Sequence, residues 1–282
     1  MIIKLAFSYS ITLSSFFKIE NINTTLENLS ALGFQLLEMY GEPNEVDLKY
    51  FSNLFNSFNF KIIGITGMWG TISPLGWKRR LLSNDISYRK YAENYVIQCI
   101  RLCNYLGCNK INICLFSDPF DSFDLTHRSI LENQKQSILS KSFPMLNLLS
   151  REAEECGIDL LLEPLNRYST PFCSTLDDCL YVAENCEGLK VMLDTFHMNI
   201  EEDSFEQTIT KSKDLLFHMH FADNNRKMPG FGHINFDEII STLVNVSYSG
   251  TISYEPTISK FHYQNDLLES KKFIEKIESK YN

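Results

Sequence analysis

The sequence predicts a single (β/α)8 barrel spanning residues 1–282, and three observations favour this fold class. The chain has 282 residues, and one α/β barrel typically takes about 250. Short apolar runs alternate with longer segments of helical periodicity, which is the pattern of repeated βα units. Gly (12) and Pro (8) are both scarce, and no change in composition marks a linker between two halves. One closed barrel therefore accounts for the length better than two ordinary domains.

Eight apolar runs predict the strands of this barrel. Parallel strands are covered by helices on both faces, so they are expected as nearly continuous apolar stretches. The segment from Ile158 to Glu163 fits that expectation. The predicted strands are Ile2–Phe7, Phe34–Tyr40, Phe60–Thr66, Lys110–Phe116, Asp159–Glu163, Lys190–Asp194, Leu216–Phe221 and Thr251–Glu255.

Amphipathic segments between these runs predict the helices. Several end in a glycine, where a left-handed residue can close a helix. An open, doubly wound sheet is the alternative, but Phe7-Ser8-Tyr9-Ser10 stands where a G-x-G-x-x-G motif would follow the first strand. The predicted helices are Tyr88–Leu106, Leu131–Cys156 (which Pro144 can kink), Leu176–Asn185, Ser204–Lys213, Phe236–Val246 and Leu267–Lys280.

The charge balance argues against nucleic acid and membranes as partners. The net charge is −9, from 35 acidic and 26 basic residues, whereas binding to phosphate backbones or anionic lipid needs clustered positive charge. The densest basic run, Lys78-Arg79-Arg80, is expected to be a solvated face. An acidic protein suits a small neutral substrate, or a metal held by carboxylates.

The cysteines indicate a reducing compartment. None of the eight forms a C-x-x-C motif, so they are expected to be buried free thiols. Serines interrupt the apolar start of the chain, which favours a first strand over a signal peptide. No apolar run reaches the roughly 20 residues that a membrane span needs. We therefore expect a cytoplasmic protein.

Four metal-capable side chains stand at the ends of four consecutive predicted strands. They are Glu163, Asp194, His220 and Glu255, separated by 31, 26 and 35 residues, about one βα unit each. Catalytic groups of a (β/α)8 barrel come from the carboxyl ends of its strands. Three carboxylates and one imidazole suit Mn²⁺, and alternatively Mg²⁺ or Co²⁺, better than structural zinc. The sequence therefore predicts a divalent metal site.

Each of these residues also has a simpler interpretation. A lone Asp or Glu at a strand end is most often a helix N-cap, and a lone buried His is most often a core group. His218 lies one layer deeper than His220 and is interpreted as a core residue or as support for the site. Four such residues at successive strand ends favour a metal site. Glu163 and Glu255 would flank the metal from different sides. One can remove a proton next to a carbonyl and the other can return it, which suffices for epimerisation or for aldose–ketose isomerisation.

Three segments resemble a known family. They read LEPLNRY (162–168), LDTFHMN (193–199) and HMHFADNNR (218–226), the last followed by PGFG (229–232). The sequence resembles the xylose-isomerase-like TIM barrels, and within them the D-tagatose 3-epimerase and D-psicose (allulose) 3-epimerase group. The resemblance implies that Glu163 and Glu255 move the C3 proton and, with Asp194 and His220, bind the metal. It also implies that His197 and Arg226 contact substrate oxygens.

One position departs from the pattern of this group. Its members usually carry a second glutamate six residues after the first, where it binds substrate hydroxyls, and here that residue is Ser169. The shorter, neutral serine weakens the assignment to tagatose or psicose. Phe7, Glu38 and Trp69 stand at or beyond other predicted strand ends and are candidates to line the substrate pocket. Aromatic residues at such positions are as often part of the core. Long connections at Gly67–Asn84 and Ser117–Leu125 are expected to shape it.

The resemblance therefore implies a metal-dependent ketose 3-epimerase, an isomerase of carbohydrate metabolism that forms a cis-enediolate. We expect Mn²⁺ as cofactor, with no nucleotide cofactor, a sugar substrate, and a homodimer or homotetramer. An aldose–ketose isomerase of the hydroxypyruvate-isomerase type, or a keto-inositol or sugar dehydratase, uses the same scaffold. Relatives of endonuclease IV need more His ligands than this chain has, and they also need a basic face, which its net charge does not favour. A non-catalytic binding barrel is the remaining alternative.

Overall fold

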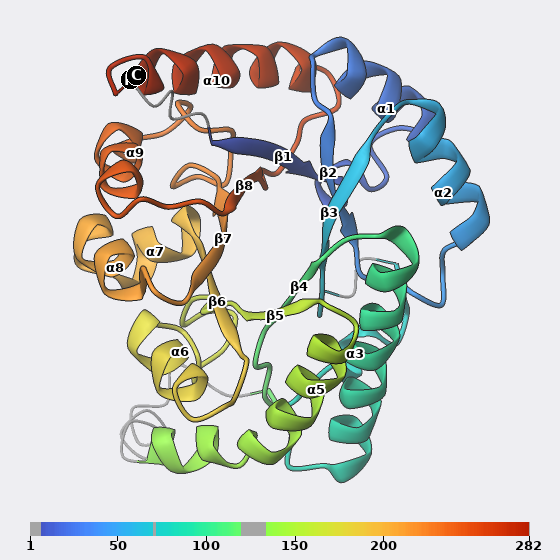
Figure 1. The fold of residues 1–282 in the computed structure, drawn as a ribbon, viewed down its shortest axis with the longest axis vertical. Helices are drawn as coiled ribbons and strands as arrows, with labels where there is room; N and C mark the ends of the chain where they lie inside the picture. The colour runs from blue at the N-terminus through green and yellow to red at the C-terminus, as the bar shows by residue number, and fades with distance from the viewer. Residues whose placement is uncertain (1–6, 70–71, 120–133, 282) are drawn as a thin grey trace. The chain divides into compact units, whose positions relative to one another are not determined.

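A computed structural model describes residues 7–69, 72–119 and 134–281, and its eight parallel strands form a closed barrel in chain order (Figure 1). This confirms the predicted (β/α)8 fold class. Every predicted strand but the first overlaps an observed one. The strands are β1 (Ser8–Thr12), β2 (Leu36–Tyr40), β3 (Lys61–Thr66), β4 (Lys110–Ile113), β5 (Asp159–Leu162), β6 (Lys190–Asp194), β7 (Leu216–Phe221) and β8 (Thr251–Tyr254).

The first strand was predicted at the wrong place. Residues 1–6 of the predicted range lie outside the described part of the chain, and β1 begins at Ser8. Two of the serines that interrupt the apolar pattern, Ser8 and Ser10, are part of the strand, and the buried Ser10 hydroxyl finds a partner in the barrel. Ser10 pairs with Ser253 of β8, and their hydroxyl oxygens are 2.5 Å apart. Buried hydroxyls are tolerated in a core when they are hydrogen-bonded in this way.

The helices follow the predicted pattern with one break. The predicted helix 131–156 is interrupted at residues 141–142, and Pro144 lies in the first turn of the second part, where its missing N–H costs no hydrogen bond. No bounds were predicted for α1, α2 and α7. The helices are α1 (Ile22–Ala31), α2 (Leu48–Ser57), α3 (Ile86–Leu106), α5 (Phe143–Glu155), α6 (Leu176–Ala183), α7 (Thr195–Glu201), α8 (Phe205–Ser212), α9 (Phe236–Asn245) and α10 (Tyr263–Glu278), with short 3-10 helices η1 (Leu13–Phe16) and η2 (Gly76–Lys78).

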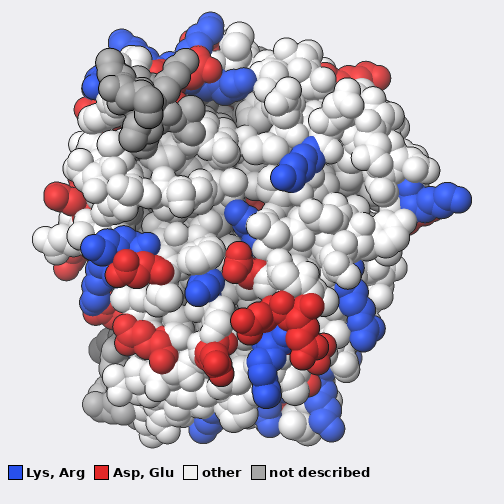
Figure 2. Space-filling model, in the orientation of Figure 1, with Lys and Arg blue, Asp and Glu red and all other residues white. Residues whose placement is uncertain are grey.

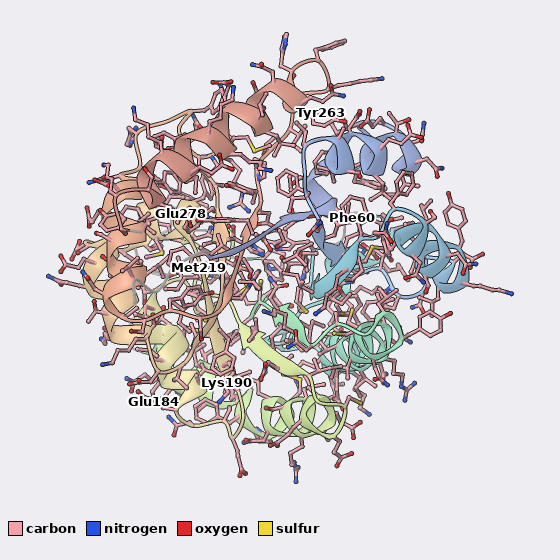
Figure 3. All side chains as sticks on the ribbon, turned by 45° about the horizontal axis from the view of Figure 1, so that its top comes forward. Phe60, Glu184, Lys190, Met219, Tyr263 and Glu278 are labelled. Carbon is pink, nitrogen blue, oxygen red and sulfur yellow. The ribbon has the colours of Figure 1, made fainter. Side chains whose placement is uncertain are left out.

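The chain divides into two compact units. The terminal unit comprises Met1–Met39, Lys49–Ile63 and Leu193–Asn282, and the central unit comprises Tyr40–Leu48 and Gly64–Met192. In the terminal unit β8 pairs with both β1 and β7, and α9 and α10 lie outside these strands (Figure 1). Met219 of β7 is fully buried in this unit (Figure 3). Glu278 of α10, also labelled in Figure 3, accepts a hydrogen bond from the Tyr9 hydroxyl over 3.0 Å.

In the central unit β4 pairs with β3 and β5, and α3 and α5 pack beside them. One prediction fails here, because Arg79 is not solvated. Its side chain is 3% exposed, donates to both carboxylate oxygens of Glu42 (2.5 and 3.2 Å) and lies 3.9 Å from the ring centroid of Tyr95. A planar guanidinium can be buried when a carboxylate and an aromatic face satisfy it together.

Two further predictions concern thiols and membranes. All eight cysteines are free, and seven of them are buried. Among the described residues, no helix is both long and apolar enough to cross a bilayer. Basic and acidic side chains are interspersed on the face drawn in Figure 2.

Candidate metal centre and active site

Three of the predicted metal ligands meet in the terminal unit. Asp194 is the last residue of β6, His220 lies one residue before the end of β7, and Glu255 directly follows β8. Each offers a ligand atom, and these atoms lie within 4.8 Å of one another. Nδ1 of His220 is 3.0 Å from Oε2 of Glu255. Asp194 and His220 are fully buried, and the Glu255 side chain is 12% exposed.

The strands place these side chains by simple alternation and register. β7 and β8 run in parallel with His220 opposite Ser253, and the Glu255 amide donates to the Phe221 carbonyl over 3.1 Å. One oxygen of Asp194, Oδ1, accepts from the Phe196 amide (2.8 Å) and thereby caps α7. The other oxygen, Oδ2, accepts from Arg226, so capping leaves this second oxygen at the cluster.

Arg226 connects two of the three proposed ligands. Its guanidinium donates to Oδ2 of Asp194 and to Oε2 of Glu255, and it lies 4.9 Å from the ring centroid of Phe196. Arg226 has a positive φ of 58°, a conformation that side-chain-bearing residues rarely adopt without support. The Arg226 side chain, which the resemblance implies contacts substrate oxygens, therefore lies at the cluster.

The support for this loop comes from Asp223, which the sequence analysis did not identify. Its buried carboxylate accepts from the backbone amides of Asn224, Gly230, Gly232 and Ile234 at 2.9–3.1 Å. A Cβ on Gly232 would lie 2.2 Å from Oδ1 of Asp223, so this position requires glycine. The spaced glycines after Asp223 were the available signal, since close packing around a carboxylate needs residues without side chains.

A second layer lies beneath the cluster. Glu38 of β2 is 2% exposed, and its Oε2 is 3.1 Å from Nε2 of His218 and 3.0 Å from Nε2 of His220. Burial alone would raise the pKa of Glu38, but His220 and His218 outweigh it and hold this pKa well below its usual range. Glu38, predicted to line the substrate pocket, is therefore placed among the histidines, where it fixes the orientation of the His220 ring.

The electrostatics of the cluster favour an ionised Glu255 and a protonated His220. Burial raises the pKa of Glu255, but His220 and Arg226 together lower it to about 2. The pKa of His220 is raised well above its usual value, because Glu255 and Glu38 outweigh the effect of burial. Buried charges need such partners, since an unpaired ion in the interior is strongly disfavoured.

His197 lies on α7, three residues after Asp194, with Nε2 4.0 Å from Oδ2 of that residue. It is 5% exposed. Burial lowers its pKa below the usual value despite the nearby Asp194 carboxylate. His197 is therefore a neutral hydrogen-bonding group at neutral pH.

The donor set fits a divalent cation. Carboxylate oxygens and one imidazole are ligands of Mn²⁺, Mg²⁺ or Co²⁺. Metal-binding histidines typically donate their other ring nitrogen to a carboxylate, and Glu38 provides that partner for Nε2 of His220. Arg226 forms ion pairs with two of these carboxylates, so positive charge is already attracted to this position. The terminal unit therefore contains a candidate metal site.

The fourth predicted ligand, Glu163, lies in the central unit and directly follows β5. It is 2% exposed. Its Oε2 accepts from Nδ2 of Asn112 over 2.7 Å and lies 3.6 Å from Sγ of Cys114, both from β4 or its end. Asn112 was not predicted, yet it fixes Glu163 because its own Oδ1 is held by the Gly67 amide over 2.8 Å.

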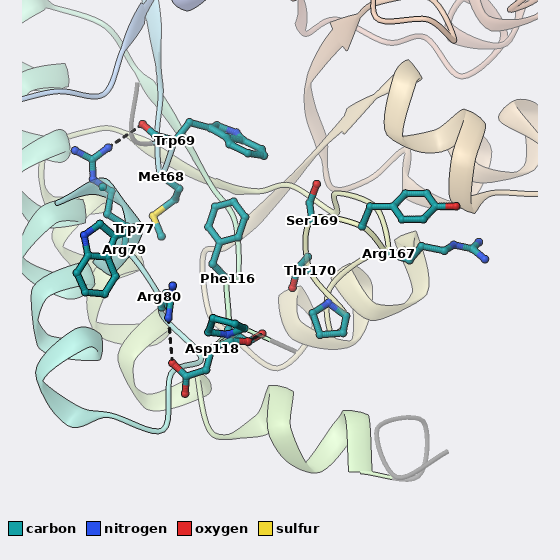
Figure 4. A pocket seen from close by; sticks show the side chains of 15 residues that line it. Met68, Trp69, Trp77, Arg79, Arg80, Phe116, Asp118, Arg167, Ser169 and Thr170 are labelled. Carbon is teal, nitrogen blue, oxygen red and sulfur yellow. Dashed lines mark hydrogen bonds and ion pairs between the residues drawn. The ribbon is translucent and has the colours of Figure 1, made fainter. Parts of the chain in front are cut away.

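The predicted pocket residues separate into two groups. Ser169 and Trp69 line a cavity of the central unit (Figure 4). Phe7 does not belong there: its assignment assumed a strand ending at Phe7, whereas β1 begins at Ser8, so Phe7 lies at the amino end of the strand beside Tyr248. The residues at 120–125 of the predicted second loop lie outside the described part of the chain.

Comparison with known proteins identifies the family. The sequence profile of the xylose isomerase-like TIM barrels matches residues 26–277. The chain belongs to this family. A D-psicose 3-epimerase of Ruminiclostridium cellulolyticum is a xylose isomerase-like relative with 31% identity over 238 residues, 83% of this chain and 77% of the relative.

Two further similarities are to 4-epimerases from Escherichia coli. A 3-dehydro-D-guloside 4-epimerase of Escherichia coli is 39% identical over 115 residues, 40% of this chain and 44% of the relative. The crystal structure of a 3-keto-D-glucoside 4-epimerase from E. coli superposes with a TM-score of 0.81 at 22% identity, covering 96% of this chain and all of that one. The superposition supports the xylose isomerase-like fold.

Proposed function

We propose that the protein is a metal-dependent carbohydrate epimerase that inverts C3 of a ketose through a cis-enediolate. The observation that carries the proposal is the buried cluster of Asp194, His220 and Glu255 at three consecutive strand ends, with Arg226 at its edge. We assign Glu163 as the fourth ligand. β5 pairs in parallel with β6, with Leu162 opposite Val191, and both strands run toward carboxylates at their carboxyl ends.

Each residue has a definite part in the proposed reaction. One of Glu163 and Glu255 takes the C3 proton as the C–H electron pair moves toward the C2 carbonyl, and the other returns a proton on the opposite face. His197, neutral at pH 7, and Arg226 hydrogen-bond the substrate oxygens. When bound, a divalent ion such as Mn²⁺ would polarise the carbonyl and stabilise the negative charge of the enediolate.

The alternatives differ in which carbon exchanges its hydrogen. The E. coli relative is named a 4-epimerase, and an aldose–ketose isomerase would act at C1 and C2. The protein is incubated with Mn²⁺ and a panel of ketoses in D₂O, and the products are examined by NMR. We expect solvent deuterium at C3 together with the inverted sugar. Deuterium at C4, or at C1 and C2, would replace the 3-epimerase assignment, and no exchange in any sugar would contradict it.

Substitution of the proposed bases tests the two-base scheme. Glu163→Gln and Glu255→Gln keep the side-chain shape but remove the proton acceptor, so each should lower turnover by several orders of magnitude. Glu184→Gln, an exposed change at the end of α6, is the matched control and should retain full activity. Circular dichroism verifies the fold of each variant. Near-normal turnover of either of the first two variants would refute their role.

A further inference from the structure

A cavity of about 470 Å³ opens in the central unit (Figure 4). This volume lies within the range of about 300–1,000 Å³ typical of small-molecule sites. Its walls come from the segments that follow β3, β4 and β5: Trp69 is three residues past β3, Phe116 three past β4, and Ser169 six past Glu163. The cavity therefore lies at the carboxyl ends of these strands, the same end as Glu163.

Aromatic rings dominate one side of this cavity. Trp69 and Trp77 are 38% and 51% exposed, unusually high values for such large apolar side chains. They are nevertheless fixed: Trp69 packs edge-on against Phe116 with ring centroids 5.2 Å apart, and Trp77 packs edge-on against Tyr88 at 5.3 Å. A rigid, exposed aromatic face binds the apolar C–H face of a sugar ring, because the negative face of the π system attracts the polarised C–H groups.

Hydroxyl-binding groups also line the cavity. The Ser169 hydroxyl lines the cavity, and its loop is fixed because Thr170 donates to the Leu115 carbonyl over 2.9 Å. Arg80 and Asp118 form a long ion pair of 3.7 Å within the cavity wall (Figure 4). A guanidinium and a carboxylate at this separation offer donors and acceptors to neighbouring sugar hydroxyls.

Two of the three arginines that line the cavity face a carboxylate, which favours a neutral ligand over an anionic one. Arg79 is engaged by Glu42 and by the Trp69 carbonyl, 2.8 Å from its Nη1. Arg80 faces Asp118, whose negative charge would repel a phosphate or carboxylate. The side chain of Arg167 points away from the Phe116 ring (Figure 4).

We propose that this cavity is a subsite for a second, non-reacting sugar ring, and that the substrate is a glycosylated ketose rather than a free one. This inference rests on the proposed epimerase function. The aromatic side chains would stack on the added ring while Ser169, Arg80 and Asp118 bind its hydroxyls. Binding energy from a remote ring can be used to position the reacting carbons.

Tryptophan emission tests the subsite independently of turnover. The chain has two tryptophans in all, and both line this cavity. We titrate the metal-loaded protein with 6-O-glucosyl-D-fructose, D-fructose and D-fructose 6-phosphate, recording emission and, separately, kcat/KM. The glucosylated ketose should change the emission at millimolar or lower concentration, and its kcat/KM should exceed that of D-fructose at least tenfold.

Variants locate the effect. Trp77→Ala should reduce the ratio of kcat/KM for 6-O-glucosyl-D-fructose to kcat/KM for D-fructose to below 2. Tyr105→Ala, an equally exposed aromatic on α3 (52%) outside the cavity, should leave this ratio unchanged. Binding of the glucosylated ketose without turnover of any ketose would support the subsite while contradicting the proposed function. An active enzyme without an emission change or a glucosyl preference would overturn the subsite, as would preference for the phosphorylated ketose.

Discussion

The loop that carries Arg226 depends on one buried carboxylate, and Asp223→Asn tests that dependence. Asp223 accepts hydrogen bonds from four backbone amides, two on each oxygen. The Arg226 amide also donates to the Asp223 carbonyl over 2.8 Å. Asparagine preserves the shape of the side chain but replaces one accepting oxygen with an NH₂ group. Two of the four amides therefore lose their acceptor and face a donor instead.

The expected effect follows from these contacts. A hydrogen bond to a charged group contributes about 1.5–3 kcal/mol, so losing two destabilises the closed loop by about 3–6 kcal/mol. This is comparable with the whole stability of a typical domain, about 5–15 kcal/mol. Loops can open locally at a lower free energy than global unfolding. We therefore expect the loop to open before the barrel unfolds.

Amide hydrogen exchange measures this opening directly. The amides of Gly230, Gly232 and Ile234 should exchange at least roughly 100-fold faster in the variant, because each 1.4 kcal/mol corresponds to a factor of ten. kcat should fall as well, since Arg226 loses its support. Asp214→Asn, at an exposed position, is the control. Exchange rates within threefold of wild type would refute the assigned role of Asp223.

Two further substitutions probe charges in the terminal unit. Glu38→Gln removes the negative charge next to Nε2 of His220, so the raised pKa of His220 should fall and the Mn²⁺ affinity, measured by calorimetry, should drop about 10–100-fold. Unchanged affinity would exclude this role. Burial raises the pKa of Glu278 above its usual value despite the hydrogen bond from Tyr9, so its ionisation disfavours folding as pH rises above about 4.5. The free energy of unfolding in urea, taken as wild type minus Glu278→Gln, should therefore be larger at pH 4 than at pH 7. A larger difference at pH 7 would refute this.

The fold and the proposed ligands were predictable because the relevant information is local. Each of Glu163, Asp194, His220 and Glu255 is identified by its own apolar run, and parallel βα units bring their carboxyl ends to one edge without further information. No long-range pairing has to be known. The structure confirms the barrel and brings Asp194, His220 and Glu255 together.

The supporting residues were not predictable because their partners are distant in the sequence. Asn112 accepts from the amide of Gly67, 45 residues earlier, and donates to Glu163, 51 residues later. Arg79 belongs to a run that resembles a solvated face, and its burial depends on Glu42, 37 residues away. Neither spacing forms a helix or strand period, so a single sequence contains no signal for these pairs.

Depth along the strand separates the proposed ligands from the residues that support them. Asp194 ends its strand and Glu255 directly follows one, whereas Glu38 lies two residues before the end of β2 and His218 three before the end of β7. Side chains at equal depth form layers across a barrel, so the deeper pair becomes the support for His220 and the shallower pair faces the site. Assigning a layer therefore requires strand ends accurate to one residue, and strand ends are what sequence patterns specify least well. The misplaced Phe7 follows from that source of error.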